Sequence, residues 1–205
     1  MDEAFWDERY RSTGGLWSGN PNPQLVAEAA DLAPGTALDA GCGEGADAIW
    51  LAARGWRVTA VDVSTVALER GDAQAAERGA DVARRIDWRH EDLTDWIPAE
   101  ASYDLVSAQF MHLPKGPREA LFRALAAAVA PGGSLLIVGH HPSDLTTIPR
   151  PALPDLFFTA SDVAALLDPH GWDVLVSAAR ARGVTDPDGR TGAIHDAVLR
   201  ARRCG

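Results

Sequence analysis

The sequence has few of the features that mark secreted, membrane-spanning or metal-binding proteins. Its two cysteines, Cys42 and Cys204, are too few and too far apart for a disulfide framework, and no Cys/His spacing indicates a zinc site. The longest run of small apolar residues, Ala124–Ala130, is far shorter than the roughly 20 residues of a membrane span. The first residues, which include Asp2 and Glu3, lack the basic stretch of a signal peptide. We therefore expect a cytoplasmic chain with no metal site.

Basic residues are also scarce. Nineteen Lys and Arg stand against 29 Asp and Glu, which gives a formal net charge of −10. Binding to a phosphate backbone or an anionic membrane requires an excess of basic side chains, so neither partner is expected, and the run Arg200–Arg203 is interpreted as solvated. The partner expected instead is a small molecule, bound by a monomer or a homodimer.

An ordinary composition, with 46% hydrophobic and 23% charged residues, indicates a globular protein. The length fits one domain over residues 1–205, because a chain of this size can bury a sizeable core without splitting. Within it we expect a helical preface over residues 1–33 and a core over residues 34–205. We find no internal repeat and no linker.

Short apolar runs alternate with stretches of helical periodicity. The runs expected to form strands are Ala37–Ala40, Val58–Val61, Ile86–Trp88, Tyr103–Ala108 and Leu135–Val138. The stretches expected to form helices are Glu44–Arg54, Val66–Arg78, Pro117–Val129, Asp162–Leu167 and, in the preface, a segment with Phe5, Trp6 and Tyr10 followed by Gln24–Leu32. This alternation predicts an α/β fold with a Rossmann-like, mostly parallel sheet and helices on both faces.

The end of the chain breaks this pattern. Trp172–Arg182 and Ala193–Arg203 are expected to be strands, joined by a turn at Asp186–Gly189 with no helix between them. Such a hairpin makes its second strand antiparallel to the rest. The expected sheet therefore has seven strands, of which the last is antiparallel.

Residues that start and stop helices support these boundaries. Ser64 can cap the helix after the second strand, and either Thr159 or Ser161 can cap the helix near Asp162. The run Pro131–Gly133 is expected to end a helix and turn the chain into the next strand.

The stretch Leu38–Gly45 follows a predicted strand and opens a predicted helix. Its glycines, at 41, 43 and 45, let the backbone approach a ligand closely at the positively polarised helix N-terminus. The spacing is G-x-G-x-G and not the G-x-G-x-x-G of dinucleotide sites. Asp39 would sit badly beside a pyrophosphate, but it suits a ligand with a cationic amino group. The alternative is an ordinary glycine-rich turn.

Two more carboxylates follow the next two predicted strands. Asp62 comes about 20 residues after the glycine turn, where an acidic side chain can accept hydrogen bonds from both ribose hydroxyls of an adenosine. Its alternative role is to cap the next helix. Asp92 could accept a bond from an adenine amino group, with Leu93 against the base. Together with Asp39 these side chains describe one crevice at the carboxyl ends of neighbouring strands.

These motifs resemble those of class I S-adenosylmethionine-dependent methyltransferases. Asp39–Gly45 match the first motif of the family, Asp62 the second and Asp92 the third. Tyr103–Ser107 resembles the fourth strand, and Pro131–Leu136 resembles the turn and the fifth strand. With the terminal hairpin as the last two strands, the resemblance covers about residues 34–203.

In the preface, Phe5–Tyr10 and Leu16–Pro21 resemble the small-molecule branch that contains tellurite-resistance and thiopurine-type enzymes. The resemblance implies S-adenosylmethionine as the cofactor. It would be held at its methionine end by Asp39 and the backbone of Gly41, Cys42 and Gly43, at the ribose by Asp62, and at the base by Val63, Asp92 and Leu93, with Gln109 near the sulfonium. Tyr10 and Trp17 would close over it, unless they are core aromatics that pack the preface on the sheet.

Three histidines are candidates for the removal of a proton from the nucleophile. They are His112, after the fourth strand, and His140 and His141, after the fifth. The alternative for His112 is to order a loop or contact the cofactor, and for the adjacent pair it is one buried and one exposed ring. Neighbours on a strand point to opposite faces, which disfavours a metal site.

The proline-rich segment His141–Phe158 is expected to arch over the crevice and, with Trp6, Phe110 and Met111, to form a mainly apolar acceptor pocket. A simple structural loop is the competing interpretation. The leading prediction is methyl transfer to a heteroatom (sulfur, oxygen, nitrogen or a metalloid) of a small molecule.

Three other functions are compatible with parts of the sequence. A macromolecular acceptor is disfavoured by the acidic charge and by the absence of an Asn-Pro-Pro-Tyr-type motif. A nicotinamide-dependent oxidoreductase is disfavoured by the glycine spacing and by the lack of a Tyr-x-x-x-Lys pair, since the only lysine is Lys115. A domain that binds the cofactor without methyl transfer, or that catalyses another reaction, stays open.

Overall fold

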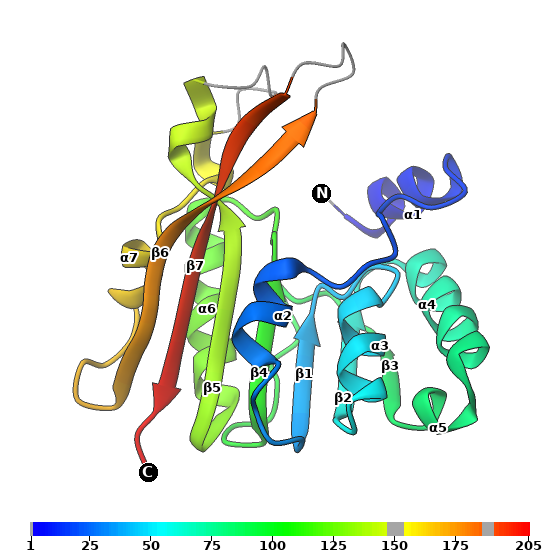
Figure 1. Cartoon of the computed structure of the whole chain (residues 1–205), viewed down its shortest axis with the longest axis horizontal. Coiled ribbons are helices and arrows are strands. Elements are labelled where there is room, and N and C mark those ends of the chain that lie inside the picture. Colours follow the sequence, from blue (N-terminus) through cyan, green and yellow to red (C-terminus); the bar gives the residue numbers. More distant parts are fainter. Residues whose placement is uncertain (1, 147–153, 186–190) are drawn as a thin grey trace.

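The computed structural model describes residues 2–146, 154–185 and 191–205 (Figure 1). The helices are α1 (Glu3–Arg11), α2 (Pro23–Ala29), α3 (Ala46–Ala53), α4 (Thr65–Arg78), α5 (Ala80–Ala83), α6 (Lys115–Ala128) and α7 (Ala160–Ala164), with 3-10 segments η1 (Pro142–Thr146) and η2 (Pro154–Leu156). The strands are β1 (Thr36–Ala40), β2 (Arg57–Asp62), β3 (Ile86–His90), β4 (Tyr103–Gln109), β5 (Val129–His140), β6 (Trp172–Thr185) and β7 (Thr191–Arg203).

The strands form one seven-stranded sheet in the order β3-β2-β1-β4-β5-β7-β6. Strands β1 to β5 pair in parallel, and β7 pairs antiparallel with both β5 and β6. The predicted α/β fold with an antiparallel last strand is therefore confirmed. The predicted turn at Asp186–Gly189 lies outside the described residues.

Alternate side chains of each central strand enter two hydrophobic layers. In β5, Leu135 and Ile137 pack in the layer with α6 and α7, whereas Leu136 and Val138 pack in the layer with α2 and α3. Because both faces of the sheet are covered, the run 135–138 is apolar without alternation, as is typical of buried parallel strands. Figure 1 shows α2 and α3 in front of the sheet and α6 behind it.

Two predicted helix caps are confirmed. The Ser64 hydroxyl accepts a hydrogen bond from the Ala67 amide at 3.2 Å at the start of α4. Of the two candidates for α7, Thr159 is the cap, because it forms a reciprocal capping box with Asp162. This helix consequently begins two residues earlier than predicted, at Ala160.

Two local features differ from the sequence-based prediction. The four-residue helix α5 was not predicted. The expected turn at Pro131–Gly133 lies within β5, where the pairing is irregular: Val129 is opposite Tyr103, but Ser134 is already opposite Leu105. The extra residues bulge from the strand, which lets β5 follow α6 directly.

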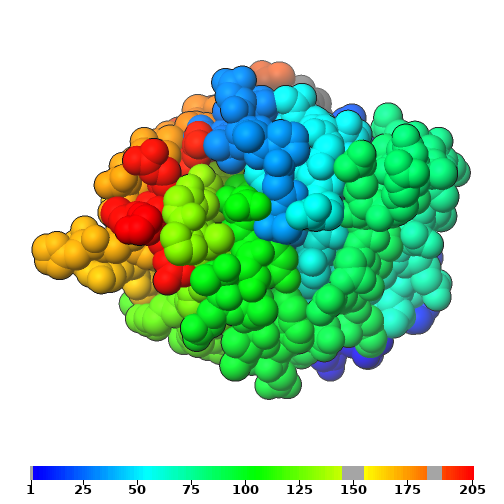
Figure 2. Space-filling view, turned by 90° about the horizontal axis from the view of Figure 1, so that it is seen from below, coloured from blue at the N-terminus to red at the C-terminus, as the bar shows by residue number. Residues whose placement is uncertain are grey.

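The N-terminal helix α1 packs against α4 near the carboxyl end of the sheet (Figure 1). Figure 2 shows the opposite end, where the chain before β1 lies beside the segments that lead into β4 and β5. Among the described residues, no helix has both the length and the apolar character needed to cross a membrane. The positions of α1 and the strand ends decide where a ligand can bind.

Candidate active site

A cavity of about 980 Å³ opens at the carboxyl ends of the parallel strands. Its size is near the upper end of ligand pockets, about 300–1,000 Å³, and parallel sheets place their ligands at this edge. Thirteen of the predicted site residues line it: Tyr10, Trp17, Asp39, Gly41, Cys42, Gly43, Asp62, Val63, Asp92, Leu93, Gln109, His112 and His140. One cavity therefore brings together residues from the preface and from the ends of five strands or the turns that follow them.

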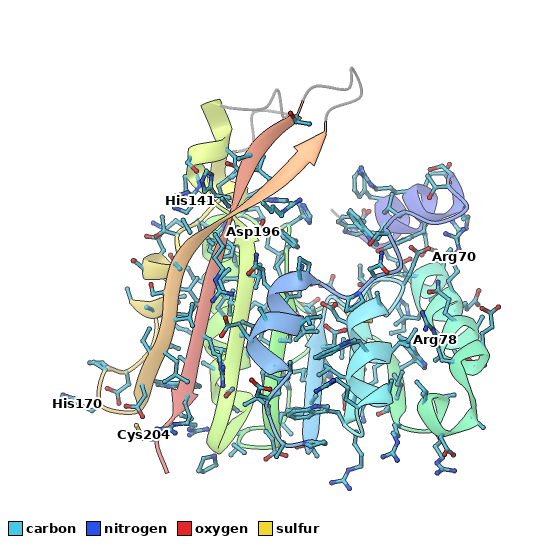
Figure 3. All side chains as sticks on the ribbon, viewed as in Figure 1. Arg70, Arg78, His141, His170, Asp196 and Cys204 are labelled. Carbon is cyan, nitrogen blue, oxygen red and sulfur yellow. The ribbon has the colours of Figure 1, made fainter. Side chains whose placement is uncertain are left out.

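His141 is the predicted site residue that does not belong to the cavity lining. Its Nδ1 lies 2.9 Å from the Ser143 hydroxyl and accepts a hydrogen bond from the Ser143 amide at 3.2 Å. Figure 3 shows His141 beside η1, across the β6–β7 crossing from α1. Adjacent residues of an extended chain point in opposite directions, so His140 faces the cavity and His141 does not.

The glycine turn between β1 and α3 is held by Asp62. The Gly43 amide donates to Asp62 Oδ2 at 2.8 Å, and the Ser64 amide donates to Oδ1 at 2.9 Å. A Cβ at Gly41 would lie 2.6 Å from the Met111 sulfur, and Gly41 has a φ of +72°. The sequence needs glycine here because both the conformation and the close approach exclude a side chain. Asp62 thus binds the amide of Ser64, the residue that caps α4, and is not itself the cap; it also faces the cavity.

Asp39 is buried at the end of β1, with 2% of its surface exposed. Its Oδ2 accepts no hydrogen bond from the described residues. Burial, together with the nearby Asp47 and Asp62, raises the pKa of this carboxyl well above its usual range. A buried carboxylate of this kind is stabilised by a cation, so the site suits a ligand with an ammonium group.

Asp47 is a cavity residue that sequence reasoning missed. It lies in the first turn of α3, is 9% exposed, and its Oδ1 accepts a hydrogen bond from the Asn22 amide at 2.6 Å. Burial raises its pKa to about 6. The available signal was its position two residues after the glycine turn, where a first-turn side chain faces the same cavity as the turn.

Replacing Asp47 by asparagine is expected to stabilise the ligand-free protein at pH 8 but not at pH 4. The folded pKa of about 6 lies above the unfolded value, so ionisation destabilises the fold progressively as the pH rises through this window. The gain reaches up to about 3 kcal/mol, or several degrees in Tm. Thermal unfolding from pH 4 to 8 measures it. A gain that does not change with pH contradicts the assignment.

Asp92 and Leu93, which follow β3, differ in exposure. Leu93 is buried, whereas Asp92 is exposed. The Thr94 amide and hydroxyl donate to Asp92 Oδ1 at 2.8 and 2.7 Å, and these bonds lower the pKa of Asp92. These bonds favour the ionised form of the carboxylate at the cavity edge.

Contacts between segments that are distant in sequence hold the preface over the cavity, and no local sequence motif predicts them. The Trp17 indole donates to the Tyr10 hydroxyl at 3.1 Å, and the Leu16 amide donates to Glu44 at 3.1 Å. Arg70 of α4 binds the other oxygen of Glu44 at 3.0 Å and lies toward the preface in Figure 3. Tyr10 is 3% exposed, but Trp17 is 52% exposed. The core-aromatic interpretation therefore fits Tyr10 and not Trp17.

A second contact of the preface reaches the start of α4. Asp7, which is 6% exposed, accepts a hydrogen bond from the Ser64 hydroxyl at 2.6 Å and pairs with Arg11 at 2.6 Å. Although burial opposes ionisation, the bonds from Ser64 and its neighbours lower the pKa of Asp7. A charged side chain of α1 thus binds the same Ser64 that caps α4.

Aromatic rings gather at the ends of β4 and β5. Ring centroids are 4.7 Å apart for Phe110 and His140, 5.9 Å for His112 and His140, and 5.8 Å for Trp6 and His112. Phe157 adds a ring 5.9 Å from His140. Phe110 has a φ of +54°, a strained conformation for a bulky residue that is found most often at functional sites.

The proline-rich segment contributes less than predicted within the described residues. Phe158 is buried in the core beside Phe122, with ring centroids 5.5 Å apart. The structural-loop interpretation therefore fits Phe158, whereas Phe157 contacts His140. Residues 147–153 lie outside the described part of the chain.

Part of the chain that lines this cavity is similar to a known protein family. Residues 37–133, which carry the glycine turn and its carboxylates, match the family described as "Methyltransferase domain". This stretch of the chain is similar to methyltransferase domains. The predicted resemblance to class I S-adenosylmethionine-dependent methyltransferases is confirmed by this match, and the seven-stranded sheet confirms the predicted fold.

Two curated relatives are similar to parts of this chain. The 2-heptyl-1-hydroxyquinolin-4(1H)-one methyltransferase of Mycobacteroides abscessus is 29% identical over 60% of this chain and 54% of its own length. Thiopurine S-methyltransferase of Pseudomonas entomophila is 37% identical over 47% of each chain. The chain spans about half the length of the curated relatives it matches.

A solved structure extends the likeness beyond the methyltransferase domain. TehB from Haemophilus influenzae superposes with a TM-score of 0.72 at 21% identity, over 98% of this chain and 66% of that one. This likeness includes the preface and the terminal hairpin. It concerns the fold alone, because one fold hosts many activities.

Proposed function

We propose that this chain transfers a methyl group from S-adenosylmethionine to a heteroatom (sulfur, oxygen, nitrogen or a metalloid) of a small molecule. The observation that carries the proposal is the buried Asp39, whose Oδ2 accepts no hydrogen bond from the described residues, in one cavity with Asp62 and Asp92. An ammonium group, a ribose and an adenine amino group would complement these three carboxylates. The methyltransferase match over residues 37–133 supports the same ligand.

The residues of the cavity fit this cofactor. Asp39 would hold the ammonium, Asp62 would accept from the ribose hydroxyls, and the backbone at Gly41 and Gly43 leaves room for close approach. Gln109, whose Nε2 donates to Ser107 at 2.8 Å, would lie near the sulfonium. When bound, the cofactor supplies a methyl group already activated by positively charged sulfur. The protein's share is therefore alignment, exclusion of water and, for some acceptors, removal of a proton.

At least one of His112 and His140 would take that proton. Both line the cavity and lie beside Phe110 and Trp6, where an acceptor can reach them. A neutral imidazole suits this role because its pKa lies near the working pH. The preface, held through Tyr10 and Glu44, would shield the reacting atoms from water.

The names of the relatives support a small acceptor. One acts on a hydroxyquinolinone and the other on thiopurines, both of which are heteroaromatic compounds. The acidic net charge of −10 also favours a small acceptor over a nucleic acid.

Calorimetry on the full chain, with S-adenosylmethionine and S-adenosylhomocysteine, tests the cofactor. Transfer of a labelled methyl group to a panel of thiols, phenols, amines and metalloid oxyanions tests the reaction. We expect binding of both ligands and product with at least one acceptor class. If neither ligand binds, the proposal is wrong. Labelling of bulk RNA or protein alone would indicate a macromolecular acceptor, and binding without any product would indicate a non-transferring domain.

Replacing His112 or His140 by asparagine tests base catalysis independently of cofactor binding. With an acceptor that must lose a proton, we expect one of the two variants to lower kcat by about 100-fold, at the lower end of general-base effects, because the sulfonium carries the activation. The Kd for the cofactor should change by less than about twofold, which equals ~0.4 kcal/mol, because the proposed role of these histidines is proton removal and not cofactor binding. If both variants keep kcat, base assistance is excluded while methyl transfer stands.

A further inference from the structure

The cavity is lined by many carboxylates and few cations. Its acidic residues are Asp2, Asp39, Glu44, Asp47, Asp62, Asp92 and Asp196, and its arginines within the described residues are Arg9 and Arg182. Arg9 belongs to α1. Arg182 belongs to β6, next to the strand ends that carry the aromatic rings. Arg182 therefore places a positively charged group at one end of an otherwise acidic cavity.

Arg182 is held in place by a buried carboxylate. Its Nε donates to both oxygens of Asp196, at 2.9 and 3.1 Å. Asp196 is 1% exposed, lies opposite His140 in the pairing of β5 with β7, and also accepts a hydrogen bond from Gln24 at 3.2 Å. These contacts fix the guanidinium on the side of the cavity where His140 lies.

The same guanidinium approaches the aromatic cluster. The central carbon of Arg182 lies 5.8 Å from the centroid of Phe110, whose ring is 4.7 Å from that of His140. A planar cation, a phenyl ring and an imidazole therefore border the same part of the cavity. This combination suits a ligand that is flat, apolar on its faces and anionic at one edge.

The position of Arg182 at the cavity differs from that of a nearby arginine with a purely structural ion pair. Arg180, two residues earlier and on the same face of β6, donates to Gln24 at 3.1 Å and pairs with Glu28. It does not belong to the cavity lining, whereas Arg182 does. The two arginines thus share one polar network, but only the second borders the proposed acceptor site.

We propose that Arg182 binds the carboxylate of a planar aromatic acceptor whose ring packs against Phe110 and His140. The inference rests on the proposed methyl transfer and names its substrate class. A guanidinium carries five N–H donors in a fork that matches a carboxylate, and Asp196 occupies only the Nε donor in the bonds described above. Asp196 and Gln24 act as positioning residues for Arg182.

The test compares isosteric probes that differ in charge. The probes are 4-mercaptobenzoate with 4-mercaptobenzamide and 4-hydroxybenzoate with 4-hydroxybenzamide. They are titrated by calorimetry into the full chain, with and without saturating S-adenosylhomocysteine. We expect the wild-type protein to bind each carboxylate about 10- to 100-fold more tightly than its amide, the range of a charge-assisted hydrogen-bonded pair. Arg182→Gln should bring the two affinities within about twofold of each other.

Arg180→Gln is the matched control, because it disturbs the same network outside the cavity. It should keep the preference for the carboxylate, and thermal unfolding shows that each variant is folded. Equal affinities in the wild type, no binding of either carboxylate, or a preference that survives Arg182→Gln would overturn the proposal. Cofactor affinity, measured on the same samples, reports separately on the proposed function.

Discussion

Replacing Asp62 by alanine is expected to weaken the binding of S-adenosylmethionine by about 10²- to 10⁴-fold. The carboxylate would accept two hydrogen bonds from the ribose, and bonds to charged groups contribute about 1.5–3 kcal/mol each. The substitution also frees the Gly43 amide, which donates to Asp62 at 2.8 Å and holds the glycine turn. The loss therefore combines missing ribose contacts with a less ordered turn. Calorimetry with S-adenosylmethionine measures it.

Two further variants separate these causes. Asp62→Asn keeps one acceptor oxygen and should give an intermediate affinity. Asp87→Ala removes an exposed carboxylate of β3, 59% exposed at its side chain, and should leave the affinity unchanged. A wild-type affinity in Asp62→Ala would show that this carboxylate does not hold the ribose.

Replacing Gly45 by alanine is expected to destabilise the fold by about 2–5 kcal/mol. The residue has a φ of +77°, which costs an ordinary residue about 1–2 kcal/mol. An added Cβ would also lie 2.2 Å from the indole of Trp88, and such overpacking costs about 1–3 kcal/mol. Because Gly45 is the N-cap of α3, the strain falls on the helix that lines the cavity. Urea unfolding gives the free energy directly.

Gly132 provides a closely matched control for backbone strain. Its φ is +78°, and a Cβ there would meet nothing within 4 Å. Gly132→Ala should therefore cost only the conformational part, about 1–2 kcal/mol. Trp88→Leu in the Gly45→Ala background should recover most of the remainder in a double-mutant cycle. Equal costs at both glycines would contradict the clash with Trp88.

The sheet could be predicted because its signals are local. A strand such as Leu135–Val138 is apolar throughout, and Thr159 with Asp162 forms a capping box within four residues. The glycine turn and Asp62 are likewise fixed by their place at strand ends. These features depend on neighbours in sequence, so periodicity and spacing were enough to find them.

The remaining site residues depend on contacts between distant segments. Asp7 binds Ser64 across 57 positions, and Gln24 binds Asp196 across 172. In the sequence Asp7 looks like any polar residue of an exposed helix, and Arg182 like a solvated strand residue. His141 shows the opposite error, because it was predicted as a site residue and lies outside the cavity lining. Its position beside His140 does not reveal which of the two rings faces the cavity. Such assignments require the tertiary structure.

The β6–β7 hairpin has an evolutionary consequence. The segment that matches the methyltransferase family ends at residue 133, whereas His140, Arg182 and Asp196 all come after it. The cavity thus joins walls encoded by separate stretches of the chain. The hairpin residues Arg182 and Asp196 are thus separate in the sequence from the glycine turn and its carboxylates. On the proposed function, a lineage could in this way exchange one acceptor for another while it keeps the same methyl donor.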